Sequence, residues 1–216
     1  MMNSTRRTLA TFGLLCAALT PTGARAQAQA HVKSAATTSA ESLNTQEREL
    51  LALANDLAKR CAATLEKWTA SKEITEEKLF GALYYPMPNA SPPRYSTDWD
   101  LLSDRDVLAL EEAVLSKSSS ILFAILIDRN GYVPTHNQRF AQPQTGNRAV
   151  DLVNSRTKMI YLDQTSLAAA HNHAAFLFQR YPRDTGEVIV DLSVPVLVHG
   201  AHWGAVRIGY RPIDAN

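Results

Sequence analysis

Residues 130–137, with the sequence NGYVPTHN, carry three side chains that can form hydrogen bonds, directly after a predicted turn. A buried strand is expected before this run, so Tyr132, His136 and Asn137 are predicted at the inner face or rim of a sheet. Three such groups could orient a small ligand, as binding pockets typically do. The alternative is structural, with His136 and Asn137 holding the following loop through hydrogen bonds to backbone groups.

Four histidines raise the question of a metal or haem. His171 and His173 are two residues apart, and this spacing places them on different sides of a helix. His199 and His202 could join them, but zinc needs three or four converging ligands, and Cys-x-x-Cys and His-Glu-x-x-His are absent. Covalent haem attachment is excluded because Cys-x-x-Cys-His is absent, whereas noncovalent haem needs only one buried histidine. No cofactor is expected; noncovalent haem, or a metal at His171 and His173, is the alternative.

Two arginines could hold a carboxylate ligand. The guanidinium groups of Arg156 and Arg180 can each form two parallel hydrogen bonds with a carboxylate, which a lysine cannot. Acidic residues such as Asp163 and Glu187 lie near them in the sequence, so structural ion pairs are the alternative.

His202 and Trp203 open a predicted strand and complete the candidate ligand-binding set. Trp203 could stack on a ligand or anchor the core. The small residues Gly204 and Ala205 that follow allow close approach of a neighbouring helix or ligand.

The sequence gives little support for catalysis. It has no Gly-x-Ser-x-Gly motif and no cysteine with a plausible base nearby. A phosphate-binding glycine loop is also absent, in a chain with only 9 glycines. The net charge of +1, from 22 basic and 21 acidic side chains, gives no reason to expect a nucleic-acid partner. Binding without catalysis is therefore expected.

The N-terminus predicts export. Arg6 and Arg7 precede an apolar stretch at residues 8–20, and Ala24-Arg25-Ala26 supplies a cleavage pattern, so residues 1–26 are predicted to be a signal peptide. The apolar stretch is shorter than the about 20 residues that span a membrane. Cleavage leaves Cys61 as the only cysteine of a periplasmic protein, and a buried, inert thiol is expected there.

The rest of the chain divides into a flexible leader at residues 27–43 and a single domain at residues 44–212. A long amphipathic helix is expected over residues 45–70, because apolar residues recur there every three or four positions. Shorter helices are expected at residues 75–81, 103–117 and 163–172, with a proline-rich loop at residues 86–93.

The second half of the chain predicts strands. The apolar run ILFAILI at residues 121–127 is typical of a central strand buried on both faces, and a return strand is expected from Tyr132. Further strands are expected at residues 174–181, 186–198 and 202–210. This order predicts an α+β fold with a five-stranded antiparallel sheet over residues 121–210, a long N-terminal helix and a helical insertion.

Four segments resemble a known family. They are LFGALYYPMPNASPPRYST, DRNGYVPTHNQRFAQPQ, NSRTKMIYLDQTSLAAAHN and FQRYPRDTGEVIVDLSVPVLVHGAHWGAVRIGY. Together, from about Leu79 to Tyr210, they resemble a PAS/Cache-like sensor domain attached to some bacterial methyl-accepting chemotaxis proteins. The chain departs from the family pattern at Ser166 and His171, where the family typically has Gly and Arg, and signalling helices are not expected in it.

The resemblance implies an exported ligand-binding sensory domain. Its expected partners are a small-molecule ligand and a membrane signalling protein. The helix at residues 45–70 could also mediate a homodimer, because an amphipathic helix must bury its apolar stripe. The alternative from another class is a periplasmic haem- or metal-binding redox or sensor protein that uses the histidines.

Overall fold

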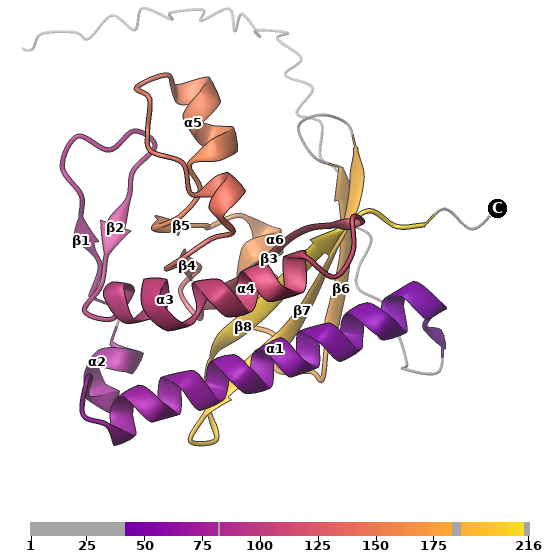
Figure 1. Cartoon of the computed structure of the whole chain (residues 1–216), viewed down its shortest axis with the longest axis horizontal. Coiled ribbons are helices and arrows are strands. Elements are labelled where there is room, and N and C mark those ends of the chain that lie inside the picture. The colour runs from indigo at the N-terminus through magenta and orange to yellow at the C-terminus, as the bar shows by residue number, and fades with distance from the viewer. Residues whose placement is uncertain (1–41, 82, 183–186, 214–216) are drawn as a thin grey trace, which may run out of the picture. The chain divides into compact units, whose positions relative to one another are not determined.

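The chain forms a curved antiparallel sheet with helices on both faces (Figure 1). The structure is a computed structural model that describes residues 42–81, 83–182 and 187–213. The predicted signal peptide at residues 1–26 and residues 27–41 of the predicted leader lie outside the described residues.

The elements follow one another in the order α1 (Thr45–Ala70), α2 (Glu76–Phe80), β1 (Tyr85–Pro86), β2 (Tyr95–Ser96), α3 (Asp100–Asp106), α4 (Leu108–Leu115), β3 (Ile121–Asp128), β4 (Tyr132–Val133), η2 (Gln138–Phe140), α5 (Arg148–Asn154), β5 (Met159–Ile160), α6 (Gln164–Ala170), β6 (Leu177–Pro182), β7 (Val188–Val198) and β8 (Ala201–Tyr210). None of the helices in the described ranges has both the length and the apolar character that crossing a bilayer requires.

The α+β class is confirmed, but among the described residues the main sheet has four strands in the order β3-β8-β7-β6, not the five predicted. The return strand expected after the turn is β4, and it pairs with the short β5, Tyr132 opposite Ile160, instead of joining β3. Gly131, with φ of +85°, provides the turn, and a Cβ on it would lie 2.3 Å from the carbonyl oxygen of Tyr161. The chain is therefore led away from the main sheet immediately after β3.

Side chains cover the edge of β3 where a fifth strand would have paired. The Ala124 amide donates to Asn137 Oδ1 over 2.8 Å, and the Leu126 amide donates to Glu111 Oε1 over 2.8 Å. An exposed strand edge invites pairing with another chain, and buried amides need acceptors. Asn137 and Glu111 meet both requirements, so Asn137 has a structural role, although its side-chain oxygen holds the preceding strand β3 and not the following loop.

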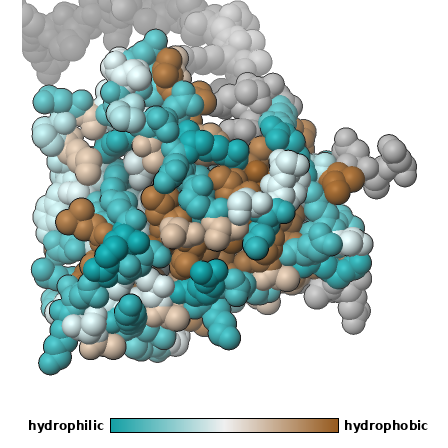
Figure 2. Space-filling model, in the orientation of Figure 1, coloured by the Kyte–Doolittle hydropathy of each residue, from teal (hydrophilic) through white to brown (hydrophobic). Residues whose placement is uncertain are grey.

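Helix α1 has the predicted bounds. Its N-cap is Asn44, whose side chain accepts a hydrogen bond from the Glu47 amide while the Glu47 carboxylate accepts one from the Asn44 amide, each over 2.9 Å. This reciprocal capping satisfies two amides at the start of the helix. The apolar side of α1 packs on the sheet and is buried through Leu57, Leu65 and Trp68, whereas its outward side is largely hydrophilic (Figure 2).

Three local expectations differ from the structure. The helix expected at residues 103–117 begins earlier and is divided at Val107 into α3 and α4. The strand expected at residues 174–181 begins only at Leu177. The proline-rich loop is bracketed by β1 and β2, which pair in antiparallel fashion.

Cys61 is fully buried in the core beneath the sheet, as expected of an inert thiol. Burial raises its pKa, and the nearby Glu111 adds to the shift. A thiol in this position stays protonated and is a poor nucleophile.

Glu111 predicts a measurable pH dependence of stability. Burial raises the pKa of this carboxyl, so the folded protein holds a proton that the unfolded chain releases above its own pKa. Folding stability is therefore lost as pH rises from the unfolded pKa towards the folded one. Glu111→Gln keeps the oxygen that accepts from Leu126 but carries no proton to lose. We expect the free energy of unfolding of the variant to rise relative to that of the wild type, by up to about 1.4 kcal/mol for each pH unit above the unfolded pKa.

Urea unfolding of both proteins between pH 4 and pH 8 measures this difference, because the other titrating groups are common to both. Glu49→Gln, an exposed position on α1, is the control and should follow the wild type. A wild-type and Glu111→Gln pair whose stability gap stays constant over this range would contradict a protonated Glu111.

Candidate functional site

A cavity of about 530 Å³ lies on the face of the sheet opposite α1. Side chains alternate along the strands, so Val190 and Leu192 of β7 pack towards α1 while Ile189 faces the cavity. The segment from η2 to α6 forms the other wall. The apolar and aromatic lining consists of Phe123, Ile125, Phe140, Leu152, Val153, Tyr161, Tyr181, Pro182 and Ile189.

Five polar side chains also line the cavity: His136, Arg156, Asp163, Ser166 and Arg207. Of the predicted site residues, the structure therefore brings His136 and Arg156 together in one hollow. A mostly apolar wall with a few placed polar groups is the usual composition of a small-molecule site.

His136 is 4% exposed, and its ring packs edge-on against Phe140, with ring centroids 5.1 Å apart. Its Nδ1 is buried and has no hydrogen-bond partner among the described residues. Burial lowers the pKa of His136 to about 3, with a further contribution from the positive charge of Arg156. The imidazole is therefore neutral at pH 7, with one nitrogen that donates and one that accepts.

Arg207 forms the polar floor of the cavity. Its Nη2 donates to Asp191 Oδ2 over 2.5 Å, its Nε donates to the same oxygen over 3.1 Å, and its Nη1 donates to Ser166 Oγ over 2.8 Å. Asp191 is fully buried on β7, which pairs with β8, so the ion pair links two neighbouring strands of the sheet. Burial by itself lowers the pKa of Arg207, but the negative charge and hydrogen bonds of Asp191 raise it by more, so the pKa of Arg207 is raised overall.

Arg156 differs from Arg207 because its side chain has no ion pair with an acid among the described residues. Its amide donates to the Phe140 carbonyl over 2.6 Å, and its carbonyl accepts from the Tyr161 hydroxyl over 3.0 Å. The guanidinium group also contacts the Tyr161 hydroxyl, and these contacts hold it at the wall of the cavity.

Asp163 is the acid in this lining, and it already has a structural role. It is the N-cap of α6, and its Oδ1 accepts from the Ser166 amide over 2.9 Å. Ser166, one of the two departures from the family pattern, in turn accepts from Arg207. The Ser166 hydroxyl is therefore part of the cavity floor, and a glycine at this position would leave Arg207 without this acceptor.

Asn137 and Tyr132 lie near His136 in the sequence but not in the cavity lining. Asn137 is fully buried and holds the edge of β3. The Tyr132 hydroxyl donates to Asp100 Oδ1 over 2.8 Å, and its ring packs at 5.6 Å from that of Trp99. Tyr132 thus belongs to an aromatic cluster beside β4.

The structure also places Arg180, His202 and Trp203 outside the cavity lining. Arg180 is exposed on β6, where its neighbour Tyr181 faces the cavity. His202 Nε2 lies 2.8 Å from the Ala170 carbonyl oxygen. Trp203 is 2% exposed, and its indole N–H donates to the Leu79 carbonyl over 3.0 Å, as expected of a core anchor.

The histidines considered for a metal come only partly together. The rings of His173 and His202 lie 4.2 Å apart, while His171 is exposed at the end of α6. Within the part of the chain that the structure describes, no group of three or more His, Cys, Asp or Glu is placed to hold a metal ion. Gly204, expected to admit a helix or ligand, instead faces β3, where a Cβ would lie 2.1 Å from the Ile127 carbonyl oxygen.

Sequence reasoning missed Arg207, Asp191 and most of the aromatic lining. One signal could have found the charged pair: Asp191 and Arg207 are each the one charged residue in a largely apolar segment, VIVDLSVPV and WGAVRIGY. Charged residues are almost never fully buried unless they are paired, so two of opposite sign in neighbouring strands indicate a buried ion pair.

Compared with known proteins, the sequence matches no protein family and no curated relative. Among solved structures, the chain is similar to an extracellular ligand binding receptor from Desulfohalobium retbaense, at 15% sequence identity and a TM-score of 0.35. The similarity covers 79% of this chain and 26% of that chain, so this chain spans about a quarter of the receptor's length. A likeness of this degree carries no conclusion about function, which has to be argued from the cavity itself.

Proposed function

We propose that this protein is an exported sensory domain that binds a small organic molecule in the cavity between the sheet and α5–α6, without catalysis. The observation that carries the proposal is the cavity of about 530 Å³, whose described wall holds a neutral His136 with an unsatisfied Nδ1 and an Arg156 that has no acidic partner among the described residues. The PAS/Cache-like resemblance, which implies a sensor, and the predicted signal peptide support it.

The wall has the features of a binding site and not of ordinary packing. Buried polar atoms are normally satisfied within the fold, and one that is not needs an explanation. A ligand that supplies the missing partner to His136 Nδ1 is such an explanation. Leu152 and Val153 of α5 line the same cavity yet are 42% and 54% exposed, so a ligand could enter beside α5 and cover them.

A membrane signalling protein is the proposed partner that would report the bound ligand. If the protein forms a homodimer through α1, the outward side of this helix would form the contact. Its apolar stripe is buried against the sheet of the same chain and is not available to a second copy.

Filling the cavity tests the proposed function. In Leu152→Trp, a large side chain is added at a position that lines the cavity and is exposed enough to tolerate it. We expect the variant to fold normally and to bind any ligand found in a broad thermal-shift screen at least about tenfold more weakly, a loss equivalent to about 1.4 kcal/mol. The screen should contain anionic, cationic and neutral organic compounds.

The matched control is Val150→Trp, on the same helix, 41% exposed and outside the cavity lining. It should bind like the wild type. Hits that bind both tryptophan variants and the wild type with equal affinity would place the ligand elsewhere and contradict the proposal.

Noncovalent haem is the second candidate, and one observation favours it. Metal ligation uses neutral imidazole, and His136 is neutral and faces the cavity. The two candidates differ in the visible spectrum of the purified protein, since only a haem protein has a Soret band.

A further inference from the structure

Building on the proposed function, we infer that the ligand is an organic carboxylate with a flat, apolar body, and that Arg156 binds its carboxylate. The inference follows from which charges in the cavity are already neutralised and which are not.

Two cations belong to the described lining of the cavity, and they differ in their partners. Arg207 is neutralised by Asp191 within hydrogen-bonding distance. Arg156 has no acidic partner among the described residues, and the one acid in the described lining, Asp163, is held as the N-cap of α6. Asp191 and Asp163 balance the two cations in number, but no ion pair joins Asp163 to Arg156 among the described residues. A carboxylate on the ligand would supply the close acidic partner that Arg156 lacks there.

Arg156 and His136 lie at the same end of the cavity because both contact Phe140. The Arg156 amide donates to the Phe140 carbonyl, and the His136 ring packs on the Phe140 ring. A guanidinium group can bind a carboxylate through two parallel hydrogen bonds, and an imidazole beside it can donate or accept one more. This end of the cavity thus supplies the polar contacts that a carboxylate with a neighbouring hydroxyl or ring nitrogen requires.

The remaining wall favours a flat apolar body. Aromatic rings of Phe123, Phe140, Tyr161 and Tyr181 surround the space, with Ile125 and Ile189 on the sheet. Aromatic pairs prefer offset or edge-to-face arrangements, and burying an aromatic body contributes the largest apolar area for its size. A planar ring attached to a carboxylate matches both ends of the cavity.

The same charges disfavour ammonium groups. A primary amine needs an acidic or carbonyl acceptor cluster, but Arg156 and Arg207 are the charged neighbours of Asp163 in this lining. Amines and zwitterionic amino acids are therefore expected to bind worse than carboxylates of the same shape.

Calorimetric titration of the purified protein tests the inference with matched probes. The carboxylates are benzoate, 4-hydroxybenzoate, phenylacetate and indole-3-acetate; each is paired with its neutral amide, and benzylamine and phenylalanine are included. We expect at least one carboxylate to bind and its amide to bind at least about tenfold more weakly. The reason is that a hydrogen bond between charged groups contributes more binding free energy than a tenfold change in affinity requires.

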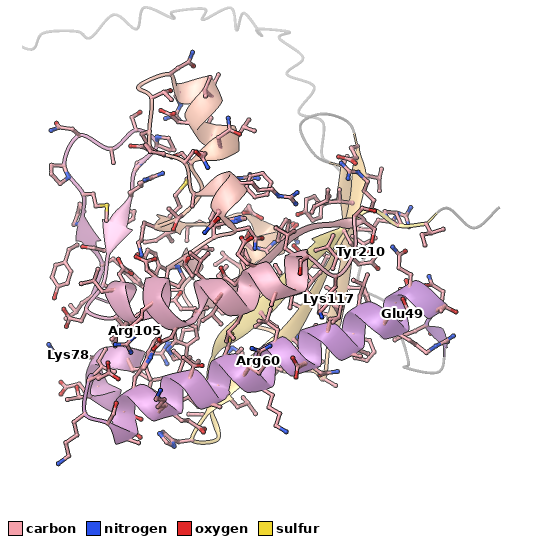
Figure 3. The ribbon with its side chains drawn as sticks, viewed as in Figure 1. Glu49, Arg60, Lys78, Arg105, Lys117 and Tyr210 are labelled. Carbon is pink, nitrogen blue, oxygen red and sulfur yellow. The ribbon has the colours of Figure 1, made fainter. Side chains whose placement is uncertain are left out.

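Arg156→Gln should weaken carboxylate binding at least about tenfold and leave amide binding unchanged, and Arg156→Lys should restore only part of the loss. Both changes alter the contact of the Arg156 side chain with the Tyr161 hydroxyl, so unchanged amide binding by the same variants is the readout that shows the cavity is intact. The matched control is Arg60→Gln: Arg60 is an exposed arginine on α1, on the opposite face of the sheet (Figure 3), and its loss should not affect binding.

Failure of the inference and failure of the proposed function have different signatures. If an amide or an amine binds as well as its carboxylate, or if no carboxylate binds while another compound does, the inference is overturned. As long as that binding is lost in Leu152→Trp, the cavity remains the binding site. If no compound in either set binds in the cavity, both fail.

Discussion

Arg207→Met is expected to lower the free energy of unfolding by about 3–5 kcal/mol. The substitution removes the cation that pairs with Asp191. Because Asp191 is fully buried, water cannot solvate the unpaired carboxylate. It also removes the donor to Ser166 Oγ. Urea unfolding followed by circular dichroism measures the loss.

A double variant separates the cost of an unpaired charge from the loss of packing. Arg207→Met combined with Asp191→Asn removes both charges, so we expect it to recover a substantial part of the lost stability, since replacing both members of a buried pair costs less than replacing one. A single variant within about 1 kcal/mol of the wild type, or a double variant less stable than the single one, would contradict this account of the cavity floor.

Trp203→Ala is expected to cost about 3–5 kcal/mol of unfolding free energy, the usual range for removing a buried large aromatic side chain. Trp203 packs edge-on against Trp99, with ring centroids 5.3 Å apart, and its N–H satisfies the Leu79 carbonyl. It therefore links β8 to the segments that carry α2 and α3.

The folded fraction of Trp203→Ala should bind ligand with wild-type affinity, because Trp203 does not line the cavity. Trp203→Phe is the intermediate control: it keeps most of the apolar volume but leaves the Leu79 carbonyl without its donor, for a smaller loss of about 1–3 kcal/mol. A stable Trp203→Ala variant that has lost ligand binding would restore the prediction that Trp203 contacts the ligand.

Much of the secondary structure could be predicted from local pattern. The spacing of apolar residues predicts the helix over residues 45–70, and a continuous apolar run of strand length predicts the strand over residues 121–127; α1 and β3 agree with them. These predictions succeed because the pattern of apolar residues within an element reflects which of its faces are buried.

The site could be predicted only in part. His136 and Arg156 were named for the chemistry of their side chains, and both line the cavity. Asn137, adjacent to His136, turned out to hold the edge of β3. Whether a polar side chain meets a ligand or a backbone amide depends on which strand edge lies opposite it, and the residue type does not contain that information.

The sequence by itself thus determined the helix and strand segments, the α+β class, and the presence of residues able to bind a charged group. Only the tertiary structure decided that β4 pairs with β5, that Glu111 and Asn137 take the place of a fifth strand, and that Arg207 is paired with Asp191. The physical reason is that each of these depends on a contact between segments distant in the sequence, where satisfying buried hydrogen bonds and charges selects one arrangement from several with the same local pattern.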